Sequence, residues 1–348
     1  MTTDWQLYSG RGERRTAPMP PAVSLEALTE PIGYIADEGV RAAVNVALAL
    51  GQPLLVTGDP GTGKTQLAHS IAFELGLPLL VFNTKTTSSA RDLFYRYDAL
   101  RHFQDAQIRG AGAGTDASAE SYIDYEALGL AILLAHEPGA VGDLLPEKHR
   151  GTGPRRAVVL IDEIDKAPRD LPNDLLNEVE DMRFTVRETG RSFAADRAFR
   201  PILVLTSNSE KNLPDAFLRR CVYFHVPVPT PERLEEIVAR RLGVEMPPRD
   251  GAAGGAAGGN GAGAAPQAGT IVRSAVAHFI NVREKQGIKK KPATAELISW
   301  TRMLIDHGLD VGRPLADESA RLLRVSYSIL AKTQEDLAIM RDERTAAR

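Results

Sequence analysis

The feature that most constrains this chain is the segment Gly58–Thr65, which has the sequence Gly-Asp-Pro-Gly-Thr-Gly-Lys-Thr. It fits the pattern G-x-x-x-x-G-K-[ST] of a phosphate-binding P-loop. An apolar run over 53–57 precedes it and indicates a buried strand, and residues 66–75 have helical spacing and end at Gly76. A strand, a glycine loop and a helix in this order place backbone N–H groups and a helix N-terminus around a bound phosphate. The segment therefore predicts a nucleotide site.

The last two residues of this loop have separate expected roles. Lys64 would reach the terminal phosphates, and the hydroxyl of Thr65 would bind Mg2+. The competing interpretation is a glycine-rich turn before an ordinary helix, and the strand-loop-helix context argues against it. We assign nucleotide binding to the consecutive residues Gly58, Asp59, Pro60, Gly61, Thr62, Gly63, Lys64, Thr65 and Gln66.

A second apolar run ends in acidic residues further along the chain. Residues 157–161 are apolar and are followed by Asp162 and Glu163, which is typical of a strand buried on both faces of a parallel sheet. Ligands bind at the carboxyl ends of the strands in such sheets. We expect Asp162 to hold Mg2+, directly or through water, and Glu163 to orient or deprotonate an attacking water. Adjacent carboxylates are otherwise often helix caps or surface residues, but the P-loop upstream favours the functional interpretation.

Two later segments supply further candidates. The run 201–206 predicts a buried strand that delivers Asn208 to the same sheet edge. The Asn208 amide could bind the attacking water or the terminal phosphate, or it could satisfy loop backbone groups. Arg219 and Arg220 are either solvated surface residues or the source of a guanidinium that stabilises the transferring phosphoryl group, in their own chain or a neighbour's. The candidate catalytic residues are Glu163, Lys64, Asn208, Arg220 and Arg219, and the candidate metal ligands are Thr65 and Asp162.

Composition and periodicity divide the chain into parts with different expected structure. Residues 251–265 are almost all Gly and Ala and predict a flexible linker. After this segment the apolar residues recur at helical spacing without any strand pattern. The predicted parts are a flexible N-terminal arm over 1–22, an αβα nucleotide-binding domain over 23–246, the linker over 247–270 and a small all-α domain over 271–348.

Some local structure can also be predicted inside the αβα domain. Helical spacing is present around 90–105 and again around 122–134. The strand-like segments 183–186 and 192–193 flank Thr189-Gly190, which predicts a hairpin.

Charge and cysteine content limit the functional classes. The net charge of −3 gives no overall basic field, so nucleic acid is not expected as the main partner. The single cysteine, Cys221, excludes an internal disulfide framework and suits a reducing compartment. No apolar run is long enough to span a bilayer, and the N-terminus lacks a signal-peptide pattern. We therefore expect a cytoplasmic protein without a membrane partner.

Taken together, these positions resemble the AAA+ ATPases and, among them, the MoxR family. The P-loop resembles Walker A, and residues 158–163 resemble Walker B. Asn208 stands where sensor 1 is expected, and the predicted hairpin is similar to the pre-sensor insertion of the family. The segment 213–220 resembles the one that carries the arginine finger, with Arg220 at the finger position and Arg219 as second choice.

This resemblance implies a fold and an activity. The fold would be a P-loop αβα sandwich with a parallel sheet and a small α-helical lid domain. ATP and Mg2+ would be the cofactors, and ATP would lie between adjacent subunits of a homo-oligomeric, hexameric ring, with the finger supplied by the neighbour. Proteins of the MoxR family act as chaperones that mature or remodel protein partners, often ones with von Willebrand factor A domains.

One departure from the family pattern leaves an alternative open. The lid helix of such proteins starts with a sensor-2 arginine, whereas residues 291–296 contain none, and Lys289, Lys290 or Lys291 would have to substitute. We expect a Mg-dependent ATPase whose hydrolysis drives conformational work on a protein partner. The rivals are a nucleotide-gated scaffold with little hydrolysis and a small-molecule P-loop kinase, and the charge balance gives no support to DNA translocation.

Overall fold

The computed structural model describes residues 30–109, 118–209, 213–248 and 267–342. These residues form two compact units, one over 36–227 and one that combines the residues before 36 with those after 227. The predicted N-terminal arm and the Gly/Ala stretch of the predicted linker lie outside the described residues.

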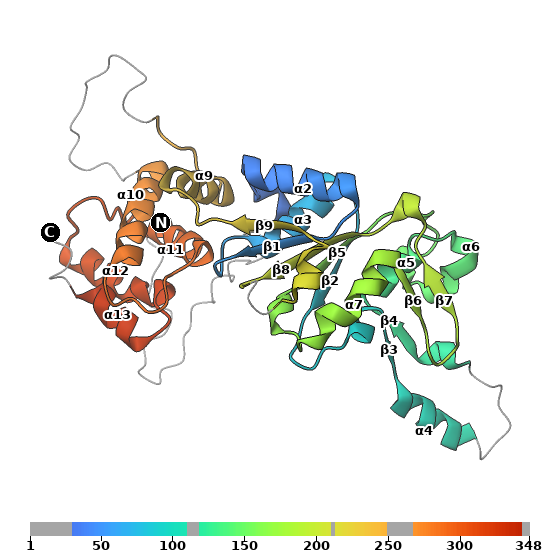
Figure 1. Cartoon of the computed structure of the whole chain (residues 1–348). Helices are drawn as coiled ribbons and strands as arrows, with labels where there is room; N and C mark the ends of the chain where they lie inside the picture. The colour runs from blue at the N-terminus through green and yellow to red at the C-terminus, as the bar shows by residue number, and fades with distance from the viewer. Residues whose placement is uncertain (1–29, 110–117, 210–212, 249–266, 343–348) are drawn as a thin grey trace. The chain divides into compact units, whose positions relative to one another are not determined.

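The first unit is built on a five-stranded parallel sheet, as predicted (Figure 1). Its strands are rich in Val, Ile and Leu, and β1 is buried along its whole length because helices cover both faces. The spatial order is β2-β5-β8-β1-β9, so β8 separates the P-loop strand from the acidic strand. The bounds are β1 Leu54–Gly58, β2 Leu79–Asn83, β5 Val158–Asp162, β8 Ile202–Ser207 and β9 Val222–Val226.

Side chains that alternate along the strands enter two different layers. Leu55, Val159 and Leu205 point into one large apolar cluster together with residues of two helices, α5 and α7. Their strand neighbours face the opposite side, where α3 buries Leu67 and Ile71. The helices of this unit are α2 Glu38–Leu50, α3 Lys64–Glu74, α4 Ala99–Arg109, α5 Ala127–Leu133, α6 Pro138–Val141, α7 Asp170–Asp181 and α8 Asp215–Leu218.

A short antiparallel ribbon interrupts the region where continuous helices were predicted. β3 Tyr95–Tyr97 pairs with β4 Ile123–Tyr125, and the prediction of helix through 90–105 and 122–134 is wrong at these strands. Tyr95 is buried and its ring lies beside Phe184, so aromatic packing and β propensity outweigh the helical spacing. The predicted hairpin around Thr189-Gly190 is confirmed.

That hairpin consists of β6 Arg183–Thr185 and β7 Ser192–Ala194 in antiparallel register. Gly190 has a φ of 70°, a conformation that favours glycine and permits the tight turn. Phe184 and Phe193 from the two strands are both buried in the cluster under α5 and α7. The hairpin is therefore anchored to the core of the first unit.

The second unit is helical. Its core contains Phe279, Trp300 and Tyr327, together with Leu234 and Val238 from the first of its helices. Its helices are α9 Pro231–Leu242, α10 Ala268–Glu284, α11 Thr294–Asp306, α12 Asp317–Leu330 and α13 Gln334–Arg341. No helix among the described residues is long and apolar enough to cross a membrane.

The boundary between the units differs from the predicted one. We expected the αβα domain to continue to residue 246, but the compact unit ends at Pro227. The reason is that α9 buries its apolar stripe against α10 and α11 rather than against the sheet. The periodicity of apolar residues in α9 is typical of an amphipathic helix, but periodicity gives no information about which core such a helix joins.

Candidate nucleotide-binding site

The P-loop connects β1 to α3 through a backbone path that requires glycine. Gly61 and Gly63 have φ values of 77° and 92°, in the left-handed region that side chains disfavour. A Cβ atom on Gly58 would lie 2.7 Å from the carbonyl oxygen of Val226 on β9. Inside the loop, the hydroxyl of Thr62 donates to the carbonyl oxygen of Asp59 at 2.9 Å. The result is a glycine-rich cradle at the N-terminus of α3, which fits a phosphate group.

Lys64 is the first residue of α3, and its side chain turns back over the loop. Its ammonium group donates to the carbonyl oxygens of Gly58 at 2.8 Å and Asp59 at 2.9 Å, and to Oδ1 of Asn208 at 3.0 Å. Lys64 is only 8% exposed, and this burial lowers the pKa of its ammonium group, while the charge of Asp165 opposes that effect. The cation is thus held by oxygen atoms at the mouth of the cradle.

Thr65 and Asp162 come together from α3 and from the end of β5. The Thr65 hydroxyl donates to Oδ1 of Asp162 at 3.0 Å. A hydroxyl and a carboxylate are the hard oxygen ligands that Mg2+ takes alongside phosphate and water. These two predicted metal ligands therefore fit Mg2+ by their chemistry and their proximity.

Glu163 follows Asp162 in an unusual backbone conformation, with φ 55° and ψ 50°. Its N–H donates to Oγ1 of Thr206 at 2.9 Å. Its carboxylate forms an ion pair with Lys166, the last residue of the 3-10 turn η6 (Ile164–Lys166), and this hydrogen bond raises the pKa of Lys166. The two side chains are 42% and 50% exposed, so the carboxylate is paired but accessible to solvent.

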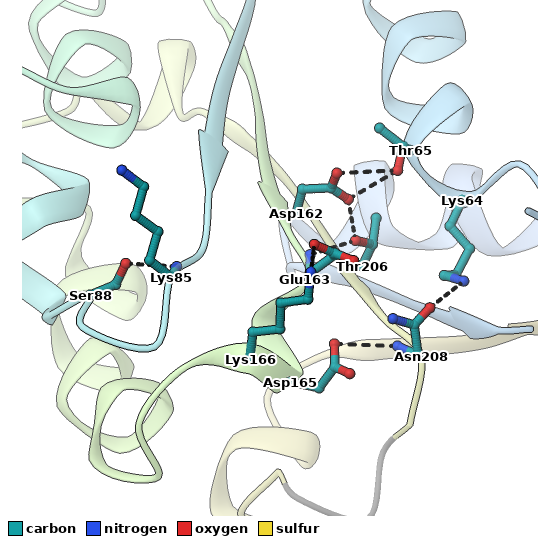
Figure 2. A network of polar contacts seen from close by, with 10 residues as sticks. All are labelled: Lys64, Thr65, Lys85, Ser88, Asp162, Glu163, Asp165, Lys166, Thr206 and Asn208. Atoms are coloured by element: carbon teal, nitrogen blue, oxygen red, sulfur yellow. Dashed lines mark hydrogen bonds and ion pairs between the residues drawn. The ribbon is translucent and has the colours of Figure 1, made fainter. Parts of the chain in front are cut away.

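Asn208 lies between these groups because of the strand order. It follows β8, which is hydrogen-bonded to β1 on one side and to β5 on the other. Its side chain meets Lys64, and its backbone N–H donates to Oδ1 of Asp165 at 3.3 Å. Figure 2 shows the residues from the P-loop, β5 and β8 converging on one place. The structure thus brings together Lys64, Thr65, Asp162, Glu163 and Asn208.

The structure does not bring the two arginines to this place in the same chain. Arg219 and Arg220 follow α8 and are exposed. The Arg220 guanidinium contacts Oε2 of Glu180 on α7 at 3.3 Å and the carbonyl oxygen of Ala216 at 3.2 Å. Gln66, which we also expected to bind nucleotide, has a buried Oε1 that accepts no hydrogen bond from the described residues.

Sequence reasoning missed Thr206. Its hydroxyl donates to Oδ1 of Asp162 and accepts the N–H of Glu163, so it contacts both members of the acidic pair. The available signal was a hydroxyl residue directly after four apolar ones in β8. A hydroxyl residue at this point usually indicates only that the strand is ending. The role of Thr206 becomes visible only once β5, which carries Asp162, is known to be the neighbour of β8.

Residues 53–221 match a family model described as the AAA domain of the dynein-related subfamily. The matched range contains the P-loop, the acidic pair, Asn208 and both arginines. This segment has the P-loop AAA+ fold. Its parallel sheet, its P-loop and the helical region that follows it agree with the AAA+ fold predicted above.

The chain is also similar to solved structures of RuvB from Thermotoga maritima, described as a Holliday junction branch migration motor. One is 16% identical, with 85% of this chain and 77% of that chain covered and a TM-score of 0.36. A proline-to-glycine variant is 17% identical, with 89% and 90% covered and a TM-score of 0.39. No curated protein matches the chain. These TM-scores are too low to position any residue of the AAA+ domain by superposition.

Proposed function

We propose that this AAA+ protein binds ATP with Mg2+ and hydrolyses it to drive conformational work on a protein partner. The observation that carries the proposal is the convergence of three strand ends. Lys64 lies 3.0 Å from Asn208, and Thr65 lies 3.0 Å from Asp162. A phosphate cradle, a metal-binding pair and a polar side chain at one point are the parts that phosphoryl transfer to water needs.

Each residue has a separate task in this proposal. Lys64 and the P-loop backbone bind the phosphates, and Asn208 orients the terminal phosphate or the attacking water. Mg2+, held by Thr65 and Asp162, supplies neutralisation of phosphate charge when bound. Glu163 accepts the proton of the attacking water, which requires its carboxylate to leave Lys166.

The exposed Arg220 supports an oligomer in which one subunit completes the site of the next. The Arg220 guanidinium contacts Glu180 of the same chain, and both side chains are exposed. An exposed guanidinium can reach the nucleotide of a neighbouring subunit. A homo-oligomeric, hexameric ring follows from the resemblance to the MoxR family. The same resemblance suggests chaperone-like maturation of a cytoplasmic partner, such as one with a von Willebrand factor A domain.

Two observations favour a second candidate, a nucleotide-gated scaffold with little hydrolysis. The carboxylate of Glu163 is held by Lys166 rather than free to act as a base. Helix α11 begins without an arginine, and Lys289, one of the residues that would replace it, is ion-paired with Glu335. Both features would slow turnover without weakening the phosphate cradle.

A single-turnover phosphate-release assay tests the proposal. The full-length protein is mixed in excess over labelled ATP in the presence of Mg2+, and bound ATP, ADP and free phosphate are followed over time. ATP hydrolysis predicts equal amounts of ADP and free phosphate. A scaffold would keep the bound ATP intact. A small-molecule kinase would form little ADP or phosphate until an acceptor is added, and it would then form ADP and phosphorylated acceptor without free phosphate. Either of these results would refute the proposal.

A further inference from the structure

The hydroxyl of Thr206 joins the two acidic residues that the proposed reaction uses in different ways. It donates a hydrogen bond to Oδ1 of Asp162 and accepts one from the backbone N–H of Glu163 at 2.9 Å. Thr206 is 1% exposed, so solvent does not reach the hydroxyl in this state. Figure 2 shows it between the two acidic residues.

The second of these hydrogen bonds supports a strained backbone. Glu163 has φ 55° and ψ 50°. Among the described residues, the only other non-glycine residue with a positive φ is Met182. The left-handed conformation costs free energy for any residue with a Cβ, and it persists only where its surroundings hold it. At Glu163 the N–H is directed to Thr206, so this hydrogen bond offsets part of that cost.

We propose that Thr206 is the residue that positions the acidic pair. Only its expected effect on turnover rests on the proposed hydrolysis. One hydroxyl fixes the metal-binding carboxylate of Asp162 and the backbone from which the Glu163 side chain departs. Without it, the Asp162 carboxylate keeps the hydrogen bond from Thr65 but rotates more freely, and Glu163 relaxes from its left-handed conformation. Mg2+ binding and the direction of the Glu163 carboxylate then change together.

The position of Thr206 on β8 extends this effect to the P-loop. Asn208 lies two residues further along and holds the ammonium group of Lys64 at 3.0 Å. β8 is hydrogen-bonded to both β1 and β5. Through this single strand, the side chains of Thr206 and Asn208 therefore position the Mg2+ ligand Asp162 and the phosphate-binding Lys64 relative to each other.

The test compares Thr206→Val with Thr206→Ser in the full-length protein. Valine keeps the shape of threonine but neither donates nor accepts, whereas serine keeps the hydroxyl and loses only a methyl group. The readouts are kcat, the KM for ATP, and the Mg2+ concentration that gives half-maximal binding of a fluorescent ATP analogue. The last is measured without turnover.

We expect Thr206→Val to lower kcat roughly a hundredfold and to raise the required Mg2+ concentration about tenfold. The KM for ATP should change little, because the phosphate cradle is intact. Thr206→Ser should stay within about threefold of the wild type in every readout, since the hydroxyl is retained. A merely structural role predicts a different result, in which both variants lose activity in proportion to their loss of thermal stability.

Two outcomes would overturn the inference: wild-type kcat and Mg2+ dependence in Thr206→Val, or equal losses in the valine and serine variants. If the wild type hydrolyses no ATP, the proposed function fails, and the Mg2+ titration still decides the role of Thr206. If the valine variant does not fold, Thr206→Ala replaces it, because alanine also lacks the hydroxyl and serine remains the matched control.

Discussion

The ammonium group of Lys64 lies 3.0 Å from the side-chain oxygen of Asn208, although 144 positions separate the two residues in the chain. The contact exists because β8, which ends just before Asn208, is paired with β1, which leads into the P-loop. It joins Lys64 to a residue whose backbone N–H donates to Asp165, just beyond the acidic strand. We expect phosphate oxygens to become partners of both groups when nucleotide binds.

Replacing Asn208 with alanine should slow turnover more than it weakens binding. Lys64 keeps two backbone acceptors, at 2.8 and 2.9 Å, so the cradle remains. Loss of the polar side chain at the reacting phosphate should lower kcat roughly a hundredfold. Asn45→Ala, at an exposed position on α2, is the matched control and should leave kcat unchanged. A purely structural role for Asn208 would instead lower thermal stability with kcat preserved.

The ion pair between Glu163 and Lys166 should restrain hydrolysis weakly. Lys166→Gln frees the carboxylate, and steady-state turnover should rise by about fivefold at most, because exposed ion pairs contribute little. Lys85→Gln makes the same charge change, and Figure 2 shows the Lys85 ammonium pointing away from Glu163. Lower turnover in Lys166→Gln alone would show that the lysine helps the reaction rather than restraining it.

Turnover per subunit should depend on protein concentration. If Arg220 completes the site of a neighbouring chain, dilution through dissociation should lower the rate of the wild type. Arg220→Ala should lower it at every concentration, by about a thousandfold. Arg219→Ala makes the same charge change at the second candidate position, and it should keep most of the activity if Arg220 is the finger. A rate per subunit that stays constant on dilution, together with an active Arg220→Ala, would exclude a finger supplied by the neighbour.

The helical unit should lose stability in mild acid. Burial, with a smaller contribution from Lys285, lowers the pKa of His278 to about 4 from 6.5. The unfolded chain therefore binds more protons between these values, and stability falls as the pH drops through that window, by about 3 kcal/mol in total. Nε2 of the His278 ring lies 2.8 Å from the Tyr327 hydroxyl, and in the protonated ring this nitrogen can only donate.

Trp300 fluorescence provides the measurement, because its ring centroid lies 5.5 Å from that of His278. In a Trp5→Phe background Trp300 is the only tryptophan of the chain. Denaturant unfolding at pH 7 and pH 4.5 should show the loss in the wild type, and His278→Gln should remove most of it. An unchanged pH dependence in His278→Gln would assign the effect to other groups.

The strands of the central sheet could be predicted because they are continuous apolar runs with polar residues at their ends. The runs predicted over 53–57, 157–161 and 201–206 correspond to β1, β5 and β8. The same logic placed Asp162 and Asn208 at one sheet edge. Candidate site residues at strand ends can be predicted from sequence because parallel strands place their last residues at a common edge of the sheet.

The contacts between these residues could not be predicted, since they depend on which strands are neighbours. Chain order does not reveal that β8 lies between β1 and β5, and this order decides that Thr206 meets Asp162. Nor does periodicity show that Tyr95 starts a ribbon strand, because its partner Tyr125 lies beyond α4 in the sequence. Both misses concern pairings between distant segments.

ATP turnover by wild-type protein and Glu163→Gln tests the central claim most directly. The two side chains have the same shape, but the amide cannot accept a proton from water at neutral pH. Both proteins should bind ATP in the presence of Mg2+ with similar affinity. The wild type should release phosphate, and the variant should release it at least about a hundredfold more slowly. Equal rates in the two proteins, or no phosphate release by the wild type, would contradict hydrolysis through Glu163.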